Sequence, residues 1–127
     1  MSSKIIPLLS VRRGAEALEF YKRAFGAEEK LVLNEGGSVF AMLTIGDAEF
    51  WMSDESPEHE NFSPESVGGS TARIILVVED VDAAHERAVS AGALEISPVG
   101  EANGWRSSRV KDPFGHHWEI AKQSTGP

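Results

Sequence analysis

The residues best suited to chemistry lie near the end of the chain, where His117 and Glu119 are two positions apart. They belong to a predicted strand over residues 116–121, and side chains two positions apart on a strand point to the same face. A catalytic metal site usually takes three protein ligands, so this pair alone predicts only a weak, adventitious site. The same alternation places three residues on the opposite face, toward a helix: His116, Trp118 and Ile120.

Other kinds of chemistry have little support. The chain has no cysteine, which excludes disulfides, thiolate metal sites and a catalytic thiol. Ser107 and Ser108 lack a His–acid partner motif of the nucleophilic type. The glycine pairs at 36–37 and 68–69 lack the lysine and the strand–helix context of a phosphate loop. His85, on a predicted helix, and His59, in an acidic loop, are expected to be solvated.

Composition restricts the partners. The chain has 127 residues, one domain's worth, and a formal charge of −8 at pH 7. This charge argues against a nucleic-acid partner. It favours a cationic ligand or simply maintains solubility. The apolar runs, such as residues 5–9, are too short to span a bilayer, and no signal peptide is readable. We expect a cytoplasmic protein with no membrane partner.

An internal repeat divides the chain into two halves. Val11 is followed by an apolar stripe and by Phe25-Gly26-Ala27, and Val78 is followed by a similar stripe and by Ala91-Gly92-Ala93. The two series have the same spacing apart from one residue. We predict a single domain, 1–127, made of two βαβββ units over residues 4–53 and 71–122. The segment 54–70, rich in Glu, Ser, Pro and Gly, joins them.

Each unit has one strand, one helix and three further strands in the prediction. The helices are expected near residues 14–25 and 81–91. Asp80 is a good N-cap and Gly92 a good stop for the second helix, whereas Arg13 marks the start of the first poorly. The predicted strands cover 4–11, 29–33, 38–45 and 48–53, then 72–78, 94–99, 105–111 and 116–121.

Four segments carry a resemblance to a known family: residues 11–27, 78–82, 91–93 and 110–116. In this order and spacing they resemble the glyoxalase / bleomycin-resistance / dioxygenase superfamily (the vicinal oxygen chelate fold), and they look like its PhnB-like branch. The resemblance implies an α+β fold whose two units form an eight-stranded, largely antiparallel U-shaped sheet with a concave cleft. It also implies a homodimer. The family contains metal-dependent enzymes and antibiotic-binding proteins, so the fold does not select a function.

The positions that hold a divalent ion in the enzymes of this family correspond here to Ile6, Phe40, Arg73 and Glu119. Only Glu119 can bind a metal, and Met42, on the same strand face as Phe40, offers a soft thioether. We therefore predict no metal and no other cofactor. Arg73 and Glu119 stand where two ligands would share one ion, so we hypothesise that they form an ion pair in the cleft. The alternative is that Arg73 reaches solvent and Glu119 pairs with water.

Large soft side chains are expected to line the cleft. Phe40 and Met42 share a strand face, and Trp51 and Trp105 lie on neighbouring strands of the predicted order. Arg106 and Arg109 point to opposite faces, so only one should reach the cleft, and Arg106 matches an arginine of the family pattern. The alternative is that the aromatic residues fill the core. The predicted ligand-binding residues are Phe40, Met42, Trp51, Arg73, Trp105, Arg106, His117 and Glu119.

We predict a metal-independent protein of the bleomycin-resistance type that binds a hydrophobic or aromatic small molecule. One alternative is a metal-dependent lyase, isomerase or dioxygenase of the same superfamily. Another is an interaction module with an unused cleft. The sequence leaves open which ligand binds and whether the two units pair within one chain or between two.

Overall fold

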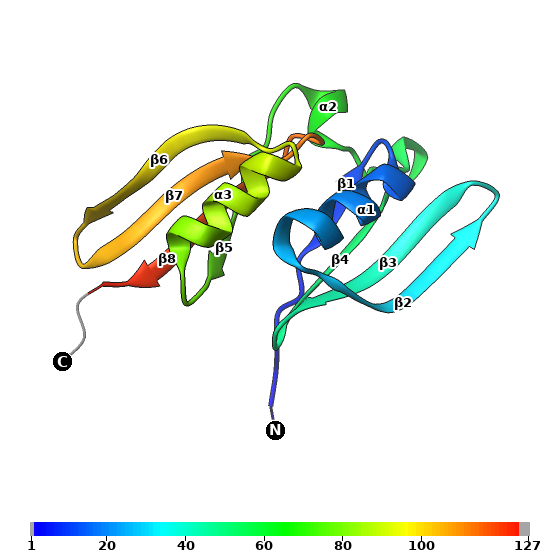
Figure 1. Ribbon diagram of the computed structural model, residues 1–127. Helices are drawn as coiled ribbons and strands as arrows, with labels where there is room; N and C mark the ends of the chain where they lie inside the picture. Colours follow the sequence, from blue (N-terminus) through cyan, green and yellow to red (C-terminus); the bar gives the residue numbers. More distant parts are fainter. Residues whose placement is uncertain (1, 125–127) are drawn as a thin grey trace.

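The computed structural model describes residues 2–124, and these form two βαβββ units (Figure 1). The elements of the first unit are β1 (Leu8–Val11), α1 (Gly14–Phe25), β2 (Glu28–Glu35), β3 (Ser38–Ile45) and β4 (Ala48–Asp54). Those of the second unit are β5 (Arg73–Val77), α3 (Val81–Ala91), β6 (Leu94–Ala102), β7 (Trp105–Lys111) and β8 (His117–Gln123). A 3₁₀ turn, η1 (Pro57–His59), and the short helix α2 (Pro64–Val67) lie between the units.

The α+β class, the two helices and the eight strands are confirmed, with shifts at the strand ends. The first strand begins at Leu8 instead of at residue 4. Pro7 still accepts a hydrogen bond from Trp51 through its carbonyl, but it has no N–H with which to continue the ladder. No helix within residues 2–124 is long and apolar enough to cross a membrane.

The eight predicted strands form two four-stranded sheets, one in each unit. The strand orders are β1-β4-β3-β2 and β5-β8-β7-β6. The pairs β1–β4 and β5–β8 are parallel, and the other strand pairs are antiparallel. The strand pairings of the described residues stay within each unit, so the units meet through side chains.

The start of α1 depends on a residue from another element. Arg13 occupies the N-cap position without a side-chain cap bond. The carboxylate of Asp54, at the end of β4, accepts hydrogen bonds from the backbone N–H of Gly14 at 2.8 Å and of Val39 at 2.7 Å. Helix α1 ends at Gly26, whose φ of 69° lies in the left-handed region that glycine adopts without strain.

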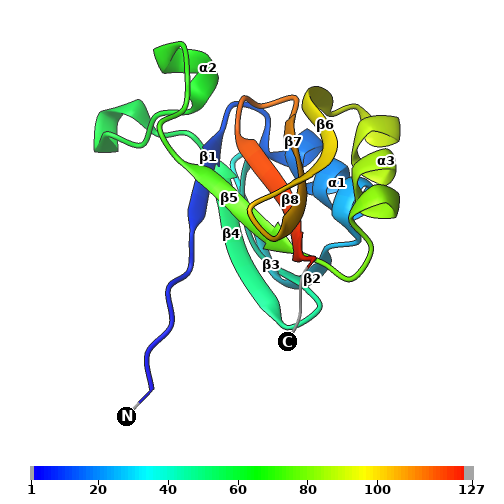
Figure 2. The same ribbon diagram turned by 90° about the vertical axis from the view of Figure 1, so that its left-hand side faces the viewer.

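Helix α3 has local signals at both ends. The Asp80 side chain accepts a hydrogen bond from Ala83 N–H at 3.0 Å, and Gly92 follows the last residue, as predicted. Helices α1 and α3 pack side by side, on one side of the molecule in Figure 2.

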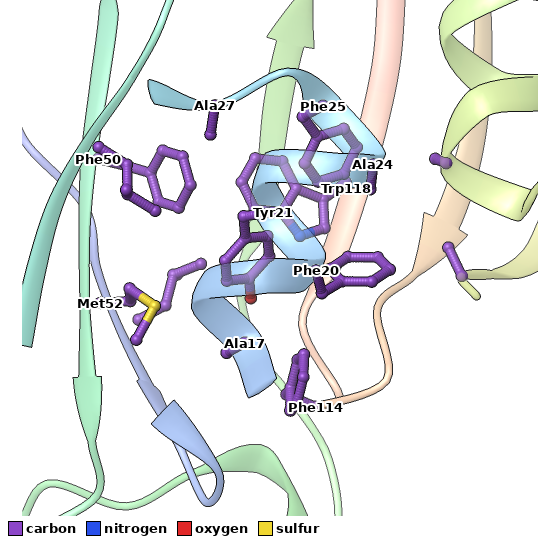
Figure 3. Close-up of a cluster of buried hydrophobic side chains, with 14 of the residues drawn as sticks. Ala17, Phe20, Tyr21, Ala24, Phe25, Ala27, Phe50, Met52, Phe114 and Trp118 are labelled. Atoms are coloured by element: carbon purple, nitrogen blue, oxygen red, sulfur yellow. The ribbon is translucent and has the colours of Figure 1, made fainter. Parts of the chain in front are cut away.

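A cluster of aromatic side chains joins the two units (Figure 3). Tyr21 on α1 contacts Phe50 of the first sheet and Trp118 of the second, with ring centroids 5.3 and 5.7 Å apart. Phe50 and Trp118 also touch each other directly, at 5.3 Å. The helix-covered faces of both sheets therefore contribute to one core, and the opposite, helix-free faces lie outside it.

Asp112 is buried within this core and begins a turn over residues 112–115, in which Gly115 N–H donates to the Asp112 carbonyl at 3.1 Å. Its carboxylate accepts hydrogen bonds from Tyr21 Oη at 2.5 Å and from Trp118 Nε1 at 3.0 Å. It also accepts the backbone N–H of Phe114 and of His116. Burial, together with the adjacent Asp112 carboxylate, raises the pKa of Tyr21 well above its ordinary value, so the phenol stays protonated as a donor.

Candidate functional site

The helix-free face of the first sheet, here called the first face, is mainly apolar. Phe40 and Met42 on β3 and Trp51 on β4 point to it, because their strand neighbours Val39, Ala41, Phe50 and Met52 are buried on the helix side. The Phe40 and Trp51 rings meet edge to face, 5.6 Å apart. The predicted grouping of Phe40, Met42 and Trp51 on one surface is therefore found.

Glu49 fixes the position of Trp51 on this face. Its carboxylate accepts a hydrogen bond from Trp51 Nε1 at 2.8 Å and pairs with Lys30 Nζ at 3.0 Å. The hydrogen bond from Trp51, followed by that from Lys30, lowers the pKa of Glu49 to about 2. The carboxylate thus stays ionised and holds the indole in place over the usual pH range.

The helix-free face of the second sheet, here called the second face, carries several charged side chains. Arg73 lies opposite His117, which in turn lies opposite Lys111. One row further along the strands, Glu119 lies between Ile75 and Arg109. At the far end of β7, Trp105 and Ser107 continue the same face, since they alternate with the buried Ser108 and Val110.

The hypothesised ion pair is present. Arg73 Nε lies 2.6 Å from Glu119 Oε1, on the second face. The Arg73 side chain is 52% exposed and that of Glu119 is 27% exposed. An ion pair this exposed contributes less than about 1 kcal/mol to stability. Its importance lies in its place, because it neutralises the only carboxylate among the positions that would bind a metal.

Arg109 and His117 form a second contact on this face. Arg109 Nε–H donates a hydrogen bond to His117 Nδ1 at 3.1 Å. Since a guanidinium cannot accept, the imidazole must be neutral, with its proton on Nε2. Burial, followed by the charges of Arg109 and Lys111, lowers the pKa of His117 below its ordinary value.

Several shallow cavities follow the two faces. On the second face, Arg109 and Glu119 line one of about 340 Å³, and Ile75 and Trp105, with Glu119, line one of about 290 Å³. Lys111 and His117 line a third, of about 260 Å³, against helix α2 and the two glycines at 68–69 that follow it. A cavity of about 300 Å³ lies beside Phe40 on the first face. A further cavity, of about 390 Å³, is an open groove beside α1 that none of the predicted site residues lines.

The prediction for Arg106 is corrected by the structure. Arg106 Nη2 lies 2.7 Å from Asp82 Oδ2, in the first turn of α3, so this arginine points to the helix side. Arg109, at the opposite phase of β7, is the arginine of the second face. Only one of the two reaches this face, as the alternation requires.

One of the other three histidines differs in its surroundings from what was expected. His85 is buried, which corrects the solvated role: its ring lies 2.7 Å from Ser108 Oγ and 2.7 Å from Glu95 Oε1. His116 Nε2–H donates to the carbonyl of Ser10 at 2.8 Å, joining the two units. His59 is exposed, as predicted.

Within residues 2–124, the predicted ligand-binding residues do not all lie together. Phe40, Met42 and Trp51 lie on the first face, whereas Arg73, Trp105, His117 and Glu119 lie on the second. None of the cavities named above includes residues of both faces. Lys111 was missed, although its spacing of two and of six residues from Arg109 and Trp105 places it on their face.

The donor set does not fit a catalytic metal ion. Within residues 2–124 no three His, Asp or Glu side chains converge as a metal site would require. Ile6 and Phe40 offer no donor atoms, and the guanidinium of Arg73 lies at the carboxylate of Glu119, where it would repel a cation. The chemistry of these side chains instead permits binding and orientation of a small molecule.

Two βαβββ units with open sheet faces define a class of small proteins, and the sequence of this chain identifies its family within that class. The chain matches the Glyoxalase/Bleomycin resistance protein/Dioxygenase superfamily over residues 6–120 and belongs to this family. An uncharacterized protein of Mycobacterium bovis is 35% identical over 122 residues, covering 91% of this chain and 80% of the relative.

Solved structures share the fold over nearly the whole chain. TioX from Micromonospora sp. ML1 has a TM-score of 0.74 and 26% identity, covering 98% of this chain and 99% of that chain. The fosfomycin resistance protein FosX from Listeria monocytogenes, in complex with Mn(II) and sulfate, has a TM-score of 0.72 and 17% identity. It covers 96% of this chain and 93% of its own, and at this identity it shows the fold alone.

Proposed function

We propose that this protein is a homodimeric binding protein of the PhnB-like branch, which takes a hydrophobic or aromatic small molecule without a metal. The ligand lies between the first face of one chain and the second face of the partner chain. The observation that carries this proposal is the Arg73–Glu119 ion pair, 2.6 Å long, at the positions where the family's enzymes hold their ion. The residues 110–116, in the order that resembles this branch, support the finer assignment.

The proposed pairing between chains follows from the packing of the helix-covered faces within one chain. Both helix-covered faces are already occupied by the shared aromatic core, as the direct Phe50–Trp118 contact shows. The outer faces keep large apolar side chains in water: Leu31 and Leu33 on the first, and Ile75 and Val77 on the second. In a dimer with two-fold symmetry, the first face of each chain would cover the second face of its partner. This arrangement would form two equivalent clefts.

The preference for an apolar or aromatic ligand follows from the side chains that remain on these faces. Phe40, Met42 and Trp51 present rings and a thioether on one side of the proposed cleft, and Trp105 presents an indole on the other. Flat apolar surfaces of this kind suit an aromatic body, and a few polar groups orient it.

A complementation experiment tests the pairing and the binding together. Trp51→Ala removes a ring from the first face and Trp105→Ala one from the second, and neither side chain is in the shared core. We expect each variant to bind the neutral dye Nile red more weakly than the native protein. Mixing the two variants and allowing subunits to exchange should restore about a quarter of the native sites, because each mixed dimer has one intact cleft.

The outcomes separate the alternatives. No recovery on mixing would show that the two faces pair within one chain. No binding of Nile red by the native protein would favour an interaction module with an unused cleft.

The metal-dependent alternative has one specific motive, because FosX, which shares the fold, was solved with Mn(II). Its test is elemental analysis of protein purified without added metal, followed by thermal melting with Zn²⁺, Ni²⁺, Mn²⁺ or Fe²⁺. We expect no stoichiometric metal and no stabilisation. A stoichiometric ion that is lost on Glu119→Gln would establish the enzyme class instead.

A further inference from the structure

The second face is positively charged on a negatively charged protein. Arg73, Arg109 and Lys111 lie on adjacent rows of this face, and Glu119 is the one carboxylate among them. Of the described residues, no Asp or Glu lies within 4.0 Å of the charged nitrogens of Arg109 or Lys111, whereas every other described arginine except Arg23 and Arg87 forms an ion pair. Two cations on one half-buried surface thus remain without a counter-charge in a chain whose formal charge is −8.

The unused polar atoms of this cluster are donors. The Arg109–His117 hydrogen bond occupies Arg109 Nε and leaves both terminal nitrogens of the guanidinium. The same bond places the imidazole proton on Nε2, so His117 offers a donor on its other side. Lys111 adds an ammonium group opposite His117. Three side chains therefore present N–H groups on one surface, and their complement is an oxyanion, which accepts several hydrogen bonds at once.

The apolar part of the second face lies beside this cluster. The cavity lined by Arg109 and Glu119 adjoins the cavity lined by Ile75, Trp105 and Glu119, since Glu119 belongs to both. Arg109 and Trp105 are four residues apart on β7, which corresponds to about 13 Å along an extended strand. That length matches an organic acid with one or two rings.

We propose that Arg109, Lys111 and His117 form a seat for the oxyanion of the ligand, a carboxylate, phosphate or sulfonate, whose apolar body extends over Ile75 toward Trp105. This inference rests on the proposed function and deepens it by naming the substrate class as aromatic or apolar organic acids. The Arg73–Glu119 pair lies at the border of the seat and neutralises the one carboxylate that would repel the anion. The acidic surface elsewhere then excludes such ligands from other sites.

The test compares an anionic dye with a neutral one on matched variants. Anilinonaphthalene sulfonate carries an oxyanion on an aromatic body, and Nile red does not. Arg109→Gln and, separately, Lys111→Gln should weaken binding of the sulfonate about tenfold, as expected for loss of a charge-assisted hydrogen bond. Both should leave binding of Nile red within about twofold. Arg106→Gln is the control, because it removes the same charge from the helix side of the same strand.

Competition then identifies the oxyanion. Naphthoate, naphthyl phosphate and naphthalene sulfonate are compared with uncharged naphthol as competitors of the dye. We expect at least one of the acids to compete about tenfold better than naphthol, and this advantage to disappear in Arg109→Gln. Equal competition by naphthol, or equal effects of Arg109→Gln and Arg106→Gln, would overturn the oxyanion seat and leave the apolar cleft standing. Absence of Nile red binding to the native protein would instead remove the proposed function.

Discussion

At the scale of single residues, Asp112 has more partners than any other side chain of the core. One carboxylate accepts hydrogen bonds from the phenol of α1, from the indole of β8 and from two backbone N–H groups of its own turn. It therefore fixes the orientation of Tyr21 and Trp118, on which the contact between the two units depends.

Asp112→Asn should destabilise the protein strongly. The amide nitrogen would face donors that now bind a carboxylate, which leaves buried N–H or O–H groups without acceptors. We expect a loss of about 3 kcal/mol in the free energy of unfolding, against about 1.5 kcal/mol for Tyr21→Phe, which removes a single donor. Urea unfolding followed by circular dichroism measures both, and a loss below about 1 kcal/mol for Asp112→Asn would contradict this role.

Residue types and spacing predicted part of the site. The common face of Phe40 and Met42 and the separation of Arg106 from Arg109 follow from strand alternation. The pairing of Arg73 with Glu119 was instead implied by the resemblance to the family, whose enzymes hold an ion at these two positions. Alternation alone does not decide which of the two sets of alternating side chains on β7 faces the helix. In the structure Arg106 forms an ion pair with Asp82 on α3, which places Arg109 on the second face.

At the scale of elements, the two helices begin in different ways. Asp80 precedes α3 directly and caps it from the adjacent position, so its role is visible in the sequence. The corresponding role for α1 belongs to Asp54, forty positions away in the chain. A local reading of Arg13 could not reveal this partner, because only the return of β4 alongside β1 brings the carboxylate to Gly14.

Asp54→Ala should therefore cost more stability than Asp80→Ala. Loss of the local cap at Asp80 is expected to cost about 1 kcal/mol. Loss of Asp54 should cost about 2–3 kcal/mol, because it leaves the N–H groups of both Gly14 and Val39 without their acceptor. Thermal unfolding of the two variants measures the difference. Equal melting temperatures would show that solvent replaces Asp54 without cost.

At the scale of the whole molecule, the repeat predicted two units but not the surfaces through which they meet. A strand pattern shows which side chains are apolar, and both faces of each sheet carry apolar side chains here. The packing of Phe50 against Trp118 decides that the helix-covered faces are turned inward. The helix-free faces are then left outside the core, where the proposed second copy would cover them.

Light scattering at micromolar concentration should return twice the chain mass of 13.8 kDa. Ile75→Asp places a charge on the second face, on the edge strand β5, and should shift the mass toward that of one chain. Val89→Asp, which alters an exposed aliphatic residue on α3, is the matched control and should remain a dimer. A native protein of single-chain mass would count against the proposed cleft.

The aromatic cluster also shows how much the two halves of the repeat differ in their contribution to the core. Helix α1 brings Phe20, Tyr21 and Phe25 to the core, whereas the buried residues of α3 are Val81, His85 and Ala88. A duplicated first half would crowd a second set of rings into space already filled, and a duplicated second half would leave a void. The two halves share one backbone arrangement, yet neither can be exchanged for the other.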